Sequence, residues 1–132
     1  MLMDTKWVFR TSGGSEDLAT SGTTPVLSDY IDLKAVSGYG DGGGAMFATV
    51  RVKSTTATTG ASFAISIADC DTSGGTYVAR SEKIVPLADV VANTVIAHLP
   101  FPQNVRQFIK LSVVPAASMA NALTVNGAIT TE

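Results

Sequence analysis

Charged side chains are scarce in this sequence of 132 residues. They make up 15% of it, against roughly a quarter in an average soluble domain. The 9 basic residues are scattered singly and the formal net charge is -2, so no basic patch is available to neutralise a phosphate backbone. We therefore expect no direct binding of nucleic acid, and a surface formed largely by serine, threonine, glycine and apolar side chains.

Cysteine and histidine each occur once, as Cys70 and His98. A single cysteine excludes an internal disulfide, and one cysteine with one histidine in distant segments is a poor ligand set for zinc. A catalytic triad would have to use His98, yet no strand-turn-helix nucleophile elbow accompanies any serine. We expect Cys70 to be a small core or turn residue and His98 to lie on the polar face at the end of a strand.

Long apolar runs are also missing. No stretch approaches the roughly 20 residues of a membrane-spanning helix, and the first residues lack a basic stretch followed by an apolar one, so we expect neither a membrane span nor a secretory signal peptide. No repeat or linker divides the chain. The sequence therefore predicts a single domain over residues 1–132.

Alternation of apolar and polar residues is the dominant pattern. It predicts strands with one buried face over residues 45–53, 62–68, 105–114 and 123–130. Shorter strands are expected over residues 6–10, 26–33, 76–85 and 94–99, about eight in all. Pro115 is expected to end the strand before it, and residues 87–92 are expected to form one helical turn at most.

Eight short strands with a turn about every ten residues predict an all-β sandwich of two sheets. A jelly roll is the first choice, because long excursions between strands suggest crossing from sheet to sheet. An immunoglobulin-like sandwich is the alternative, although its Cys, Trp and Cys set is missing and Trp7 lies at the wrong end of the chain. Stretches rich in Gly, Ser and Thr, at residues 11–24 and 35–44, are expected to be long loops that act as arms.

Motifs of glycine and aspartate predict no ligand site. Gly38, Gly40 and Gly43 match the pattern G-x-G-x-x-G, but a strand follows them where a dinucleotide needs a helix N-terminus. The aspartates on either side of Cys70 lack the ligand spacing of a calcium loop. An odd separation places Asp29 and Asp32 on opposite faces of an extended segment, so they do not form an acid and base pair. We therefore predict no catalytic, cofactor-binding or metal-binding residues.

Several segments occur together in a characteristic order. They are the extended Asp4-Thr5-Lys6-Trp7-Val8-Phe9, the strand Tyr30-Ile31-Asp32-Leu33 followed by a Gly-rich loop, the alternating residues 46–52 and 63–67, Leu99-Pro100, and Arg106-Gln107-Phe108-Ile109-Lys110-Leu111 before a final hairpin. In these segments the chain resembles the small capsid cement, or decoration, proteins of tailed phages. It departs from them in its final hairpin, where residues 115–120 make the connection and no glycine precedes Gly127.

This resemblance implies a jelly roll or related β-sandwich that is made in the cytoplasm of the host cell and lies on the outer surface of an assembled virion. Such a protein would act as a homotrimer that bridges subunits of the major capsid protein, without a cofactor and without catalysis. Aromatic and arginine side chains on loops or termini often anchor interfaces, and burial within the same subunit is the alternative for the aromatic ones. The expected contact residues are Trp7, Phe9, Arg10, Tyr39, Phe101 and Arg106.

Two other functions remain open at this point. A carbohydrate-binding or adhesive β-sandwich of a phage spike or fibre would share the fold, although sugar platforms usually need several coplanar exposed aromatics and this chain has few. An enzyme is the weakest of the three, because no nucleophile, base and orienting group occur at a recognisable spacing.

Overall fold

The computed structural model describes residues 7–35, 46–57, 62–116, 119 and 121–131. The described residues form nine strands and short 3-10 helices. The strands are β1 (Leu18–Ala19), β2 (Val26–Leu27), β3 (Ile31–Asp32), β4 (Met46–Thr55), β5 (Ser62–Cys70), β6 (Val78–Pro86), β7 (Val95–Pro100), β8 (Phe108–Pro115) and β9 (Leu123–Thr131). The 3-10 helices are η2 (Leu33–Ala35) and η3 (Leu87–Asp89).

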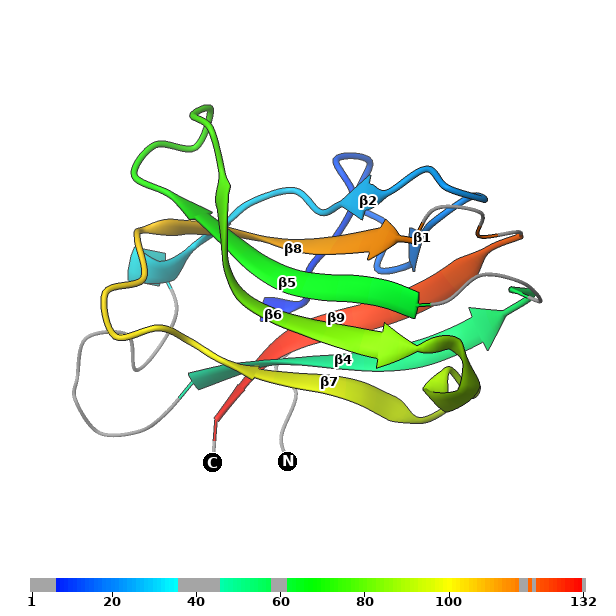
Figure 1. Ribbon diagram of the computed structural model, residues 1–132. Helices are drawn as coiled ribbons and strands as arrows, with labels where there is room; N and C mark the ends of the chain where they lie inside the picture. Colours follow the sequence, from blue (N-terminus) through cyan, green and yellow to red (C-terminus); the bar gives the residue numbers. More distant parts are fainter. Residues whose placement is uncertain (1–6, 36–45, 58–61, 117–118, 120, 132) are drawn as a thin grey trace.

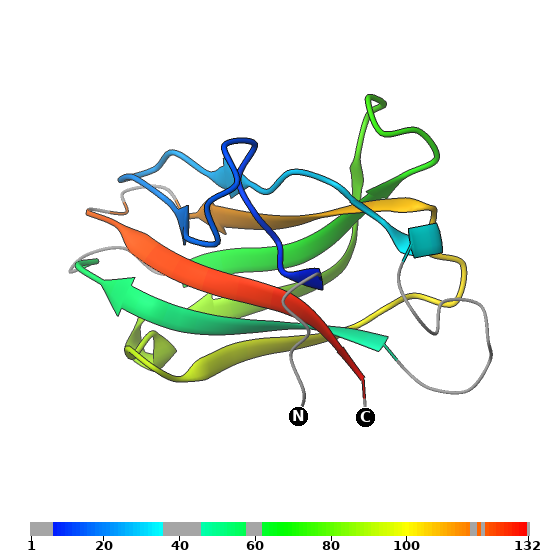
Figure 2. The same ribbon diagram turned by 180° about the vertical axis from the view of Figure 1, so that it is seen from behind.

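The strands form two antiparallel sheets that lie face to face, seen from opposite sides in Figures 1 and 2. One sheet has the order β1-β9-β4-β7. The other has the order β2-β8-β5-β6, with β3 also paired to β8. The prediction of an all-β sandwich of two sheets is therefore confirmed.

The pairing pattern is that of a jelly roll. β2 and β3 both pair with β8, so they count together as one interrupted strand. The resulting eight strands pair first with last, second with seventh, third with sixth and fourth with fifth. Rolling up one long hairpin produces this pattern, and the chain accordingly crosses between the sheets after β1, β3, β4, β6, β7 and β8.

The core lies between the sheets and follows the predicted alternation. Ala48, Val50 and Val52 of β4 are fully buried, as expected for one face of a strand. The inward faces of the other long strands add fully buried side chains, among them Phe63, Ile65, Ile67, Ile109, Leu111, Val113, Leu123 and Val125. Since each such side chain contributes roughly 1.5–3 kcal/mol when buried, this core accounts for most of the stabilisation of the fold.

Three expected strands differ in detail. The strand predicted over residues 26–33 is interrupted at Ser28, whose hydroxyl accepts a hydrogen bond from the N–H of Leu111 at 2.8 Å. Within the described part of residues 6–10, Val8 forms one isolated bridge with Ala128 and no continuous strand. The strand predicted from residue 105 begins at Phe108.

Pro115 and the segment after β6 agree with the expectations except in detail. Strand β8 ends at Pro115 as expected, but the proline itself is still paired, opposite Phe63. This is possible because only the proline N–H is missing and its carbonyl remains available. The helical turn expected over residues 87–92 is shortened to η3.

Candidate contact surface

Residues 7–10, here called the N-terminal strap, cross from one sheet to the other at an edge of the sandwich. The N–H of Phe9 donates to the carbonyl of Gly127 in β9, at 2.8 Å. One residue later, the carbonyl of Arg10 accepts a hydrogen bond from the N–H of Asp29, at 2.7 Å, in the segment between β2 and β3. The strap therefore ties β9 of the first sheet to the segment between β2 and β3 of the second.

Phe9 closes the core beneath the strap. Its side chain is fully buried, and the absence of a side chain at Gly127 makes room for it. A Cβ atom at Gly127 would lie 2.5 Å from Leu111 Cδ2 and 3.4 Å from Phe9 Cδ2. A ring without exposed surface cannot meet a partner while the chain keeps this fold, so the role of Phe9 lies within its own subunit and not in the predicted contact set.

The residues that follow the strap are attached to the first sheet. Arg10 Nη2 forms an ion pair with Glu16 at 3.1 Å, and Lys53 Nζ of β4 forms one with Asp17 at 2.6 Å. Asn126 Nδ2 of β9 donates to Asp17 Oδ1, at 2.9 Å, and to the carbonyl of Glu16. Together with β1, these bonds show that residues 11–24 do not form the arm expected from their composition.

The attachment at Asp17 predicts a dependence on pH. The hydrogen bond from Lys53, followed by that from Asn126, lowers the pKa of Asp17 from its usual 3.8. Because the pKa is lower in the folded chain, the stabilising contribution is complete above pH 3.8 and is lost as the pH falls through the folded value. In an NMR titration, we expect the Asp17 carboxyl to titrate below 3.8 and the Lys53→Met variant to raise its midpoint.

The control for this titration is Lys83→Met, which removes an exposed lysine of β6. Its Asp17 midpoint should equal that of the unmodified chain. An Asp17 midpoint that does not move in Lys53→Met would contradict the role of the ion pair.

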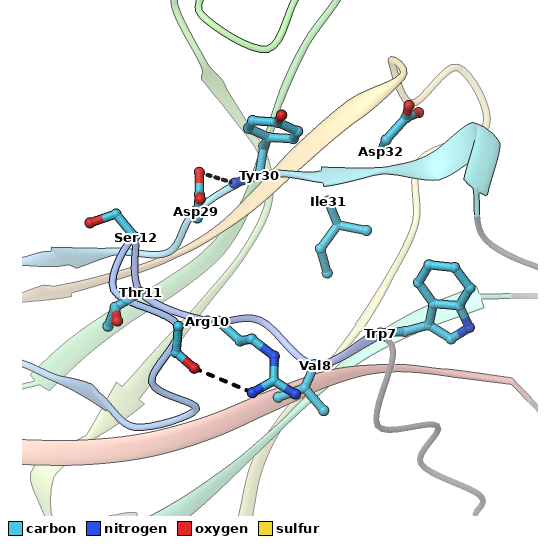
Figure 3. A pocket seen from close by; sticks show the side chains of 10 residues that line it. Trp7, Val8, Arg10, Thr11, Ser12, Asp29, Tyr30, Ile31 and Asp32 are labelled. Carbon is cyan, nitrogen blue, oxygen red and sulfur yellow. Dashed lines mark hydrogen bonds between the residues drawn. The ribbon is translucent and has the colours of Figure 1, made fainter.

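A pocket of about 340 Å³ lies between the strap and residues 29–32. Figure 3 shows Ile31 of β3 pointing toward the strap, with Trp7 and Val8 beneath it. Asp29 and Asp32 lie at opposite ends of the pocket, and Figure 3 shows the carboxylates of both turned to the same side of the segment, away from the strap. The prediction that they occupy opposite faces is therefore wrong, since the interrupted strand breaks the alternation between them.

A buried carboxylate, Asp69, holds the loop between β7 and β8. Its side chain is fully buried and accepts hydrogen bonds from Arg80 Nη1 at 3.0 Å and from Arg106 Nε at 3.1 Å. The backbone N–H of Arg106 also donates to it, at 3.0 Å. The hydrogen bond with Asp69 raises the pKa of Arg106 above its usual value. Arg106, expected as an external contact, thus bonds to Asp69 within its own chain.

Phe101 lies at the start of the same loop. Its N–H donates to the carbonyl of Met46 at 3.0 Å, and its half-buried ring packs against the core. The loop therefore brings Phe101 and Arg106 to one end of the sandwich, whereas Trp7 and Arg10 line the pocket at the strap. Tyr39 lies outside the described residues.

The outward face of the second sheet carries exposed apolar side chains that the sequence did not single out. Val114 of β8, Ala64 of β5 and Ile84 of β6 lie opposite one another in a single row. Ile84 is 55% exposed and Val114 43% exposed. In the next row, Leu27 of β2 is 49% exposed and lies opposite Ser112. These residues, with Ser66 between them, are here called the outer patch.

The outer patch is bordered by one exposed charge, because Glu82 of β6 lies opposite Ser66. Ser66 is buried, whereas Ala64 and Ser112 are small and half-buried, so a flat partner surface could approach the sheet closely at these two positions. Contiguous exposed apolar side chains rimmed by polar ones often mark protein–protein interfaces. The pattern could have been found in the sequence only by placing β6, β5, β8 and β2 side by side in the correct register.

The other sheet carries a polar cluster around His98. Its Nδ1 atom lies 2.9 Å from Thr49 Oγ1, which in turn lies 2.7 Å from Thr130 Oγ1. The imidazole stacks on Phe47, with ring centroids 4.1 Å apart. His98 thus lies within β7 and is linked through these two threonines to β4 and β9. Thr49 and Thr130 are both buried, although the alternation places them on the face of their strands that was expected to be polar.

Comparisons with protein-family models and with curated proteins find no match for this chain. In the described part of the chain, no group of three or more His, Cys, Asp or Glu residues is placed to hold a metal ion. No helix among those residues is long and apolar enough to cross a membrane. The outer patch and the pocket at the strap are therefore the features on which a functional proposal rests.

Proposed function

We propose that this chain is a capsid cement protein of a tailed phage, which binds the outside of the assembled head as a homotrimer and bridges subunits of the major capsid protein. The outer patch is the observation that carries the proposal. It offers exposed apolar area on a rigid sheet, and Ile84, Val114 and Leu27 come from three different strands. The resemblance of the sequence to cement proteins and the jelly-roll pairing support the same assignment.

The mechanism is thermodynamic linkage. A protein that binds the assembled lattice and not the free capsid subunits stabilises the lattice by mass action. Trimerisation makes the binding multivalent, so modest contacts per subunit give slow release through a high effective concentration. A load from packaged DNA is then distributed over more interfaces.

The composition of the patch suits this task. Apolar area supplies affinity without requiring charged partners, and the small residues in its centre allow close contact. Lys110 of β8, two residues before Ser112, has its Nζ atom 4.5 Å from the centroid of the Tyr77 ring and so is directed to its own chain. We therefore expect binding to heads to depend weakly on salt.

The test uses phage heads stripped of the protein. Adding the purified chain back should raise the temperature at which the heads release their DNA, and Ile84→Lys should weaken binding at least roughly tenfold, because a charge would be buried at the contact. Binding is measured by sedimentation of heads with labelled protein, and the oligomeric state by analytical ultracentrifugation.

Val91→Lys is the matched control for Ile84→Lys. Val91 is 54% exposed, close to the 55% of Ile84, but lies in the connection between β6 and β7. It should bind heads as the unmodified chain does. Equal binding by the two variants would exclude the outer patch, and heads whose stability does not respond to the protein would contradict the cement function itself.

A further inference from the structure

The wall of the strap pocket that contains β3 turns its polar side chains away from the pocket. Figure 3 shows the carboxylates of Asp29 and Asp32 on the same side as the ring of Tyr30, away from the strap. Strand β3 pairs Asp32 with Phe108 of β8. The rings of Tyr30 and Phe108 meet edge to face, with their centroids 5.3 Å apart. These four residues therefore lie on the outward face of the second sheet, and they are here called the acidic end.

Strand β8 connects the acidic end with the outer patch. Phe108, Ser112 and Val114 are an even number of residues apart and share one face of the strand. Ile109 and Leu111, on the opposite face, are fully buried. At about 3.3 Å per residue, Phe108 and Ser112 lie roughly 13 Å apart. Since a standard interface covers about 800 Å² on each partner, a capsid subunit seated on the outer patch also covers the acidic end.

Both carboxylates of the acidic end are oriented by bonds to their own chain. Asp29 Oδ1 accepts a hydrogen bond from the N–H of Tyr30, at 2.9 Å. Asp32 Oδ1 accepts bonds from the N–H of Lys34 and from Gln107 Nε2, both at 3.0 Å. Among the residues that the structure describes, neither aspartate takes part in a salt bridge. Their charges are therefore fixed in direction and available to a partner.

Negative charge predominates on the outward face of this sheet. Glu82 borders the outer patch and is exposed, and within the described part of the chain it has no ion pair either. Lys110, on the same face of β8 as Phe108, directs its Nζ atom to the ring of Tyr77. Covering carboxylates with a surface that lacks cations would cost their hydration. A partner that docks on this face therefore has to bring cations of its own.

We propose that the capsid subunit that receives the outer patch places an arginine against Tyr30, within reach of Asp29 and Asp32. Tyr30 is 44% exposed. A guanidinium group packs on an aromatic ring and donates two parallel bonds to a carboxylate, whereas a lysine ammonium group acts as a point charge. This contact presupposes the proposed function, since it names the partner's side of the same interface.

The arginine chiefly fixes the orientation of the cement protein on the head. Exposed ion pairs contribute little affinity, and complementary charges at the edge of an interface act mainly on the association rate and on the choice of partner. The dependence of binding on salt therefore stays weak, as expected for the apolar outer patch. Charge reversal is different, because it places two cations opposite each other.

The test measures binding of charge-reversed variants to heads stripped of the protein. Asp29 is exposed and its carboxylate bonds to the backbone of the next residue, so Asp29→Lys should fold, which its amide NMR spectrum checks. An ammonium group opposite the arginine should weaken binding at least about fivefold. Asp89→Lys, in η3, makes the same change at another exposed aspartate and should bind as the unmodified chain does.

Chemical modification of the heads identifies the cation. Phenylglyoxal blocks arginine and acetic anhydride blocks lysine, and electron microscopy shows whether the treated heads stay intact. On arginine-blocked heads, Asp29→Lys and the unmodified chain should bind within about twofold of each other, because the guanidinium group that repels the new lysine is gone. On lysine-blocked heads, the loss of about fivefold or more should persist.

Equal binding of Asp29→Lys and Asp89→Lys to untreated heads would overturn the proposal. So would a loss in Asp29→Lys that disappears on lysine-blocked heads or persists on arginine-blocked ones. Complete loss of binding to arginine-blocked heads would also contradict it, since this contact contributes little affinity. In each case the unmodified chain still binds untreated heads, whereas absence of that binding is the failure of the cement function itself.

Discussion

Replacing Asp69 with alanine is expected to lower the free energy of unfolding by about 3 kcal/mol, because it leaves two arginines without their buried partner. The carboxylate is fully buried, whereas the side chains of Arg80 and Arg106 are 25% and 30% exposed. Partial access of water to the arginines places the expected loss near the lower end of the range for a broken buried pair. Urea denaturation, monitored by circular dichroism, measures this loss of free energy of unfolding.

Asp71, two residues after Asp69, provides the control for the Asp69→Ala variant. Asp71 lies 3.8 Å from Arg106 Nη1, but its side chain is 77% exposed. Exposed ion pairs contribute about 0–1 kcal/mol, so Asp71→Ala should be close to neutral. Similar losses in the two variants would show that burial is not what makes Asp69 important.

A double-mutant cycle separates the ion pair from the loss of packing. Removing Asp69 and Arg106 together should cost less than the sum of the two single changes, because the second change removes the charge left unpaired by the first. Additive losses would mean that the two side chains stabilise the loop independently, and that the loop with Phe101 is held mainly by its contact with Met46.

Local alternation was sufficient to predict the long strands. In β4, β5 and β9 the apolar residues recur at every second position, and the register places them all against the core. β1 could not be predicted in this way because it has two residues. It is held by bonds outside any pattern, such as that from the N–H of Leu123 to Thr20 Oγ1, at 3.1 Å.

The candidate site was less predictable because it depends on register and on distant partners. Ala64 separates Ile84 from Val114 only when β5 lies between β6 and β8. In the sequence, Asp69 and Asp71 resemble an acidic turn, and nothing near them indicates that one is buried against Arg106. A residue type can suggest an interface anchor, but whether it points outward is decided by the topology.

Phe9 illustrates this limit and gives the second large prediction. Phe9→Ala should lower the free energy of unfolding of the isolated chain by about 3–5 kcal/mol, because it removes a fully buried ring and leaves a cavity beside Gly127. A residue that served only as a contact with a partner would leave the isolated chain unchanged. Phe9→Leu, which retains much of the volume, should lose less and guards against a variant that does not fold.

The fluorescence of Trp7 shows whether the strap unfolds before the two sheets when Phe9 is replaced. If the buried ring holds the strap to the core, the fluorescence of Trp7 in Phe9→Leu should change at a lower urea concentration than the circular dichroism of the sheets does, because the strap then detaches before the sandwich unfolds. Coincident transitions would mean that the strap and both sheets unfold as one unit. A stability of Phe9→Ala equal to that of the unmodified chain would contradict the burial of the ring and return Phe9 to the set of partner contacts.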